Sequence, residues 1–137
     1  MPLWLLSDDT PGFPPAELAA PDPDGILAIG GDYGIPRLLA AYRGGIFPWS
    51  VWRGRITWHS PDPRFVLLRE NFRIPHTLRR LLKKAPYRIT VDRAFPQVIA
   101  ACARAPRPDG ETTWITPALR RGYTALHRAG HAHSAEA

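Results

Sequence analysis

Apolar residues spaced three and four positions apart recur along the sequence, and this spacing predicts helices. Four stretches have the pattern: residues 36–43, 75–84, 92–103 and 117–129. Proline lies near the start of several stretches, and glycine follows the first and the last, as is usual at helix ends. Asp92 and Thr116 are the expected N-caps of the third and fourth helices. Leu119, Tyr123 and Leu126 should line one side of the fourth helix.

Other stretches have a composition that favours strands, and we predict strands at Arg55–His59, Arg64–Arg69 and Tyr87–Val91. The first 25 residues are rich in proline and acids, so they should run over the surface as extended chain. Gly45–Trp49 is interpreted as a tight aromatic turn. Residues 131–137 resemble the opening of a further strand that has no partner. Helices and strands together predict an α+β fold.

Composition narrows the possible classes of protein. The chain has 137 residues, 45% hydrophobic and 22% charged, which is enough apolar material for a folded core. No run of about 18 apolar residues exists, and the acidic start lacks the basic lead of a signal peptide. Cys102 is the single cysteine, so no internal disulfide can form. We therefore expect a cytoplasmic protein without a membrane partner.

Charge is distributed unevenly. Residues 1–50 contain two basic and six acidic residues, 2 − 6 = −4, and the remainder contains sixteen and six, 16 − 6 = +10. This asymmetry indicates a polyanionic partner for the second part of the chain, such as a nucleic acid. A solvated basic surface in an arginine-rich protein is the alternative.

The predicted helix at residues 75–84 has the most informative pattern. Its bases lie on one side and its three leucines on the other. The candidate nucleic-acid-binding residues are those bases and one that follows: His76, Arg79, Arg80, Lys83, Lys84 and Arg88. With no acid among them, they suit a phosphate backbone. A solvated helix face remains open, whereas a membrane-surface helix is less favoured because a core would bury the leucines.

Tryptophans next to bases are candidates for stacking on nucleobases, worth about 1–3 kcal/mol per base. Trp49 and Trp114 lie in turn-like sequence, so we expect both to face a pocket. Trp58 lies within a predicted strand and should be a core residue, as most tryptophans are.

Other chemistry has weaker support. His127, His131, His133 and Cys102 lack the spacing of a known metal motif, so we predict no metal site. His131 and His133 would face the same way on a strand. Cys102 lies on the apolar side of the 92–103 helix with Phe95 and Ile99, which favours an inert core thiol.

Three motifs in order carry a family resemblance: GIFPW at residues 45–49, WHSPDPR at 58–64 and GHAHS at 130–134. They resemble the leucyl/phenylalanyl-tRNA–protein transferases. The resemblance implies a small N-terminal α/β domain at residues 1–62. It also implies the first part of an acetyltransferase-like catalytic domain at residues 63–137.

The resemblance further implies an activity. The family transfers leucine or phenylalanine from aminoacyl-tRNA to proteins that begin with Lys or Arg, which marks them for N-end-rule degradation. It needs no cofactor and is expected to act as a monomer. Trp49 and Trp114 match its substrate-contacting tryptophans, and the basic helix matches its tRNA-facing surface.

The resemblance also implies that catalytic residues lie beyond Ala137. We therefore expect a truncated chain that is inactive alone and exposes an unpaired strand edge. The alternative is a non-catalytic tRNA- or RNA-binding module.

Overall fold

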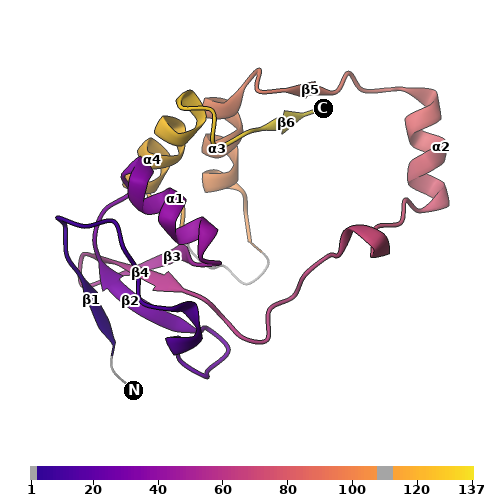
Figure 1. Ribbon diagram of the computed structural model, residues 1–137. Coiled ribbons are helices and arrows are strands. Elements are labelled where there is room, and N and C mark those ends of the chain that lie inside the picture. The colour runs from indigo at the N-terminus through magenta and orange to yellow at the C-terminus, as the bar shows by residue number, and fades with distance from the viewer. Residues whose placement is uncertain (1–2, 108–112) are drawn as a thin grey trace.

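A computed structural model describes residues 3–107 and 113–137 and has an α+β fold. Figure 1 shows helices α1 and α4 lying over a four-stranded sheet, with α3 beside α4 and α2 standing apart. The strands are β1 (Trp4–Leu6), β2 (Ile26–Gly30), β3 (Phe47–Trp52), β4 (Arg55–His59), β5 (Thr90–Val91) and β6 (Ala135–Glu136). The helices are α1 (Ile35–Arg43), α2 (His76–Lys84), α3 (Phe95–Arg104) and α4 (Pro117–Arg128), with short 3₁₀ turns at Ala16–Leu18 and Arg69–Asn71.

The main sheet has the strand order β1-β2-β4-β3. Strand β1 is parallel to β2, and the other two pairings are antiparallel. The predicted strand Arg55–His59 is confirmed as β4. The interpretation of Gly45–Trp49 as a turn was wrong, because β3 begins at Phe47 and pairs with β4 across the two-residue turn Arg53–Gly54.

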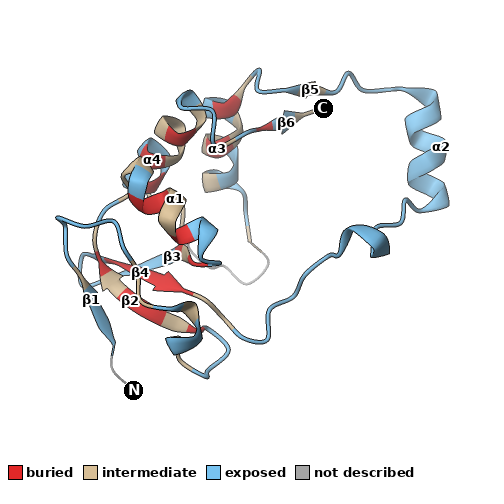
Figure 2. Ribbon diagram, viewed as in Figure 1, coloured by how far each residue is buried: buried red, intermediate tan, exposed pale blue. Residues whose placement is uncertain are grey.

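The core lies between this sheet and the helices α1 and α4 (Figure 2). Trp58 is fully buried, as predicted, and its indole Nε1 donates to the Gly30 carbonyl at 2.9 Å. Phe13 packs edge-on against it, with ring centroids 4.8 Å apart. Burying a tryptophan removes about 150–250 Å² from water, an upper estimate of about 4–6 kcal/mol. Leu126 of α4 belongs to the same core cluster, so residues on both sides of position 62 share it.

The predicted helix ends agree with the structure in α1 and α4. Helix α1 has proline in its first turn and ends at Gly44. At the start of α4, the Thr116 hydroxyl accepts from the Leu119 amide at 3.2 Å, as an N-cap should. Leu119 and Leu126 are buried, which confirms the predicted apolar side of this helix.

Two expectations for α3 were wrong. The helix begins at Phe95, and Asp92 is not its N-cap. Phe95 and Ile99 are buried as predicted, but Cys102 is exposed and is not a core thiol. The helix packs through its first two turns only, so the same apolar spacing leaves its last turn uncovered.

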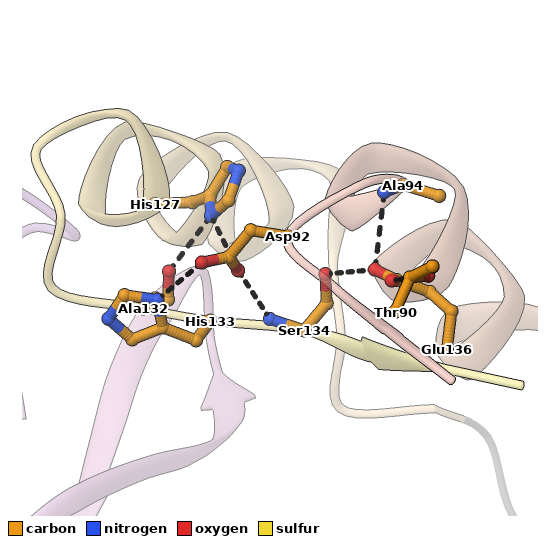
Figure 3. Close-up of polar contacts among 8 residues, drawn as sticks. All are labelled: Thr90, Asp92, Ala94, His127, Ala132, His133, Ser134 and Glu136. Carbon is orange, nitrogen blue, oxygen red and sulfur yellow. Dashed lines mark hydrogen bonds and ion pairs between the residues drawn. The ribbon is translucent and has the colours of Figure 1, made fainter. Parts of the chain in front are cut away.

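Strands β5 and β6 pair with each other, and a network of polar side chains holds the pair together (Figure 3). The Asp92 carboxylate accepts from His133 Nδ1 at 2.7 Å and from the Ser134 amide at 2.9 Å. Glu136 accepts from the Ser134 hydroxyl at 2.6 Å and from the Ala94 amide at 3.2 Å, so it caps α3 from 42 residues away. The expected unpaired strand therefore has a partner, since β6 pairs with β5.

Residues 62–89, which we call the arc, are exposed without exception. They leave the body after β4 and return at β5 (Figure 1). The predicted strand Arg64–Arg69 does not form, and of the predicted strand Tyr87–Val91 only β5 does. Helix α2 forms where predicted, but no core covers its leucines, which was the wrong part of that expectation.

Candidate functional site

A β-bulge positions Trp49. In the pairing of β3 with β4, Pro48 faces Trp58 and Ser50 faces Thr57, so Trp49 is the extra residue. A bulge turns a side chain out of the regular alternation and is common beside functional sites. The Trp49 side chain remains 39% exposed instead of joining the core below it.

Aromatic and polar contacts support Trp49 from behind. Its ring meets the His59 ring edge-on at 5.3 Å between centroids and lies 5.8 Å from Phe47. His59 is buried, and its Nδ1 lies 2.9 Å from the Asp24 carbonyl. Because a carbonyl can only accept, Nδ1 carries the proton. His59 Nε2 lies 2.9 Å from the Thr57 hydroxyl, so the imidazole is held at both nitrogens.

Trp114 approaches from the loop before α4. Its ring is perpendicular to that of Tyr123, with centroids 6.5 Å apart. The Thr116 cap fixes the start of α4 two residues later, which also fixes the position of this loop. Trp114 is half-buried.

Trp49 and Trp114 line one cavity of about 340 Å³, which we call the aromatic cleft. The structure therefore brings together the two tryptophans that the sequence singled out. The remaining lining residues are Ser50, Val51, Arg107, Thr113 and Thr116. Its volume falls within the usual range for small-molecule sites, about 300–1,000 Å³. Aromatic walls with an arginine and hydroxyls between them suit a flat, polar-edged group such as a nucleobase.

A pair of tyrosines extends the aromatic surface beyond Trp114. The hydroxyls of Tyr42 and Tyr123 are hydrogen-bonded to each other. Burial raises the pKa of the Tyr123 phenol well above its usual value of 10, and its contact with Tyr42 raises the pKa further. Burial raises the pKa of Tyr42 as well, so both hydroxyls stay protonated at neutral pH. One of the two protons forms the hydrogen bond between the tyrosines, and the other is available to a further acceptor.

Sequence reasoning missed this tyrosine pair. It treated Tyr123 only as an apolar position of its helix and did not connect it with Tyr42, which is 81 residues away in the sequence. The available signal was the phenol itself, since a tyrosine on a packed helix face usually needs a hydrogen-bond partner.

The candidate tRNA-binding residues form a separate surface. His76, Arg79, Arg80, Lys83 and Lys84 belong to α2, and Arg88 follows in the arc. All are exposed, and none forms an ion pair within residues 3–107 and 113–137. Helix α2 lies away from β3 and α4 in Figure 1, so the structure does not bring these bases to the aromatic cleft.

Two of the histidines considered for a metal site, His127 and His133, have structural partners. His133 donates to Asp92 and lies in irregular chain, so the expected alternation with His131 on a strand does not occur. His127 stacks on Phe95, with ring centroids 4.2 Å apart. In the part of the chain that the structure describes, no group of three or more His, Cys, Asp or Glu side chains could hold a metal. No helix in that part is long and apolar enough to cross a membrane.

Comparison with protein families gives two adjoining matches. Residues 66–137 match the model described as leucyl/phenylalanyl-tRNA protein transferase. Residues 31–62 match the N-terminal domain model of the same family. The first match alone covers just over half of the chain.

Curated relatives carry the same family name, leucyl/phenylalanyl-tRNA–protein transferase. A protein of Xanthomonas oryzae pv. oryzae is 48% identical over 135 residues, which cover 98% of this chain and 54% of the relative. One of Myxococcus xanthus is 48% identical over 138 residues, covering 100% and 58%. One of Lawsonia intracellularis is 50% identical over 134 residues, covering 98% and 58%.

The chain spans about half the length of the curated relatives that it matches. Alignments with an average identity near 50% cover 98% of this chain's own residues. This chain therefore belongs to the leucyl/phenylalanyl-tRNA–protein transferase family.

Proposed function

We propose that this chain supplies the aminoacyl-tRNA-binding part of an aminoacyltransferase. The enzyme transfers leucine or phenylalanine from tRNA to a protein that begins with Lys or Arg, which marks that protein for N-end-rule degradation. It acts in the cytoplasm as a monomer, without a cofactor. Family membership supports the reaction class, and the aromatic cleft supports the kind of ligand.

The observation that carries the proposal is the placement of Trp49 and Trp114 on one cavity. A bulge turns the first out of its sheet, and a capped helix start positions the second. Two core tryptophans would be turned inward instead, as Trp58 is. In this proposal, the terminal adenosine of the tRNA stacks between them, and the protonated pair Tyr42 and Tyr123 offers a hydrogen-bond donor beside it.

The chemistry requires little activation. The tRNA ester is already reactive, and the acceptor α-amine has a pKa near 8, so it needs modest deprotonation and accurate placement. Donors are required for the developing oxyanion. We propose that these groups belong to the part of the relatives that this chain does not match. An apolar side-chain pocket would discriminate by about 1–3 kcal/mol per methylene, which gives graded preference between amino acids.

The basic side of α2 supplies the second half of the proposal. Five adjacent bases that have no carboxylate partner among the residues the structure describes suit the tRNA backbone, where each neutralised phosphate adds to the salt dependence of binding. Such contacts position the tRNA without reading its sequence.

The direct test is to measure, by calorimetry, the binding of a 3′-aminoacyladenosine analogue that has a stable amide linkage. Trp49→Ala and Trp114→Ala should each weaken binding by about 5- to 150-fold, because a lost base stack costs about 1–3 kcal/mol. Trp52→Ala is the matched control, since Trp52 lies on the same strand, is 52% exposed and does not line the cleft. Equal binding by all three variants would remove the cleft from the proposal.

The alternative function, a non-catalytic RNA-binding module, rests on the exposed bases alone. It predicts that charge reversal of Arg79, Arg80, Lys83 and Lys84 abolishes tRNA binding. It also predicts that loss of Trp49 does not change the affinity for leucyl-tRNA relative to uncharged tRNA. The transferase proposal predicts losses from both changes. Filter binding of leucyl-tRNA and uncharged tRNA by the two variants separates these functions.

A further inference from the structure

The arc exposes an unusual amount of apolar side chain. Eleven large hydrophobic side chains lie between residues 62 and 89, each at least 39% exposed. Phe65 is entirely exposed, and Leu67 is 68% exposed. Single exposed hydrophobic residues are ordinary, but a long succession of them marks an interaction surface.

Both ends of the arc are fixed to the body. Before it, the Ser60 amide donates to the Gly25 carbonyl at 2.8 Å, and within its first residues Arg64 Nη1 donates to the Gly45 carbonyl at 2.8 Å. After it, the Asp92 amide donates to the Ser134 carbonyl at 3.0 Å, beside the β5–β6 pair. The arc is therefore a tethered strap of 28 residues in which no residue is buried, so little apolar burial offsets the entropy of ordering it.

Helix α2 divides this strap into two chemically different sides. Leu78, Leu81 and Leu82 lie within about 100° of one another around the helix axis, and the bases fill the opposite side. All three leucines are 42–53% exposed. One side thus suits an apolar protein surface, while the other remains free for phosphate.

The relatives are longer than this chain, and their additional length supplies a candidate partner for the leucine side. The family match to residues 66–137 includes all of the arc except its first four residues. The Xanthomonas oryzae relative matches this chain over 54% of its length, leaving 100 − 54 = 46% as polypeptide outside the match. A domain of that size needs a shared apolar core, and the arc offers uncovered apolar residues within the matched part.

We propose that the arc is a docking surface for this remaining polypeptide, which packs on Leu78, Leu81 and Leu82 and leaves the basic side of α2 exposed. The surface is neither a dimer interface nor a membrane-binding face. The proposal does not depend on the transferase reaction, and its test uses no tRNA.

The test is amide hydrogen exchange of this chain alone and of this chain extended by the unmatched part of the Xanthomonas oryzae relative. Alone, amides at residues 65–89 should exchange within seconds, whereas those of β2 and α1 are protected. In the extended protein, exchange at 65–89 should slow at least 100-fold. Unchanged fast exchange there, with β2 and α1 still protected, contradicts the proposal.

Two variants of the extended protein test which side of α2 contacts the remaining polypeptide. The double change Leu81→Asp and Leu82→Asp should restore fast exchange in the arc while the body stays protected. The matched change Arg80→Glu and Lys83→Glu, on the opposite side of the same helix, should leave the arc protected. Equal effects of the two changes would overturn the assignment of the leucine side.

Other occupants give different outcomes. Arc protection in the chain alone that rises with protein concentration indicates a second copy, and protection on adding phosphatidylglycerol vesicles indicates a membrane; either result overturns the proposal. If the extended protein does not fold, exchange is measured in the full-length relative over the stretch aligned with 65–89. Protection there supports the proposal, and fast exchange refutes it.

Discussion

The body of the molecule and the arc obey the same sequence pattern but differ in what covers it. In the body, α1 packs on the sheet and α4 packs against α1 and α3, so Leu38 and Leu119 are fully buried. In the arc, the apolar side of α2 is at least as well segregated from its charges, yet none of its residues is buried. Amphipathic spacing therefore identifies which side of a helix is to be covered, but it does not identify the covering surface.

The largest expected difference between the body and the arc comes from truncating one large side chain in each region. Trp58→Ala should destabilise the protein by about 3–5 kcal/mol, because it leaves a cavity under the sheet and loses the bond to Gly30. Leu81→Ala in the arc should change stability by less than about 0.5 kcal/mol. Urea unfolding followed by circular dichroism measures both. Similar losses would mean that α2 packs in solution.

The next largest change in stability is expected where α4 packs tightly against the rest of the body at Gly122. A Cβ at Gly122 of α4 would lie 2.7 Å from the Tyr33 carbonyl oxygen, closer than such contacts occur. Gly122→Ala should therefore destabilise by about 1–3 kcal/mol, despite the better helix propensity of alanine. Gly12→Ala is the control, since nothing lies within 4 Å of its Cβ position, and it should be neutral. Thermal unfolding compares the two, and a stabilised Gly122→Ala protein would show that α4 sits further from Tyr33.

A smaller effect is expected at the start of α4. Thr116→Ala removes the acceptor for the Leu119 amide and should cost about 1 kcal/mol. Thr124→Ala, also on α4, removes only an exposed bond to the Arg120 carbonyl and should change stability by less than about 0.5 kcal/mol. Chemical denaturation resolves this difference. Equal stabilities of the Thr116→Ala and Thr124→Ala proteins would mean that the Thr116 cap does not hold the start of α4, and therefore does not position Trp114.

The junction between body and arc should be sensitive to acid. The hydrogen bond from His133 lowers the pKa of Asp92 below 3.8, and that from the Ser134 hydroxyl lowers the pKa of Glu136 below 4.5. Because both folded values lie below the unfolded ones, this stabilisation is present above about pH 5 and is lost as pH falls through the folded pKa values. The effect should be small, since both groups reach solvent.

Stability measured between pH 6 and pH 2.5 tests this linkage. In the double variant Asp92→Asn and Glu136→Gln, the decline over that range should be shallower than in the parent. An unchanged slope would assign the acid sensitivity to other carboxylates.

Much of the fold was predictable wherever local spacing and local packing agree. Helices α1, α2 and α4 and strand β4 lie close to their expected bounds. Strands β1 and β2 were missed because they pair across more than 20 residues and are only three and five residues long. The predicted strand at Arg64–Arg69 failed because β-favouring residues form a strand only beside a partner.

The candidate site was predictable in its residues but not in its geometry. Turn-like sequence singled out Trp49 and Trp114, yet the device that exposes Trp49 is a bulge, which depends on register with β4. The Tyr42–Tyr123 contact joins helices 81 positions apart, so no local pattern encodes it. The exposure of the bases on one side of α2 was predictable from their spacing alone, because nothing in the described residues covers them.

The most direct test of the central claim is transfer of radiolabelled leucine from charged tRNA to a protein that begins with arginine. The chain extended by the unmatched part of its Xanthomonas oryzae relative should transfer leucine, and the Trp52→Ala variant should do so at a similar rate. The double variant Trp49→Ala and Trp114→Ala, folded and still bound to tRNA through α2, should lose at least 100-fold in kcat/KM. Transfer by that double variant at the parent rate would contradict the account.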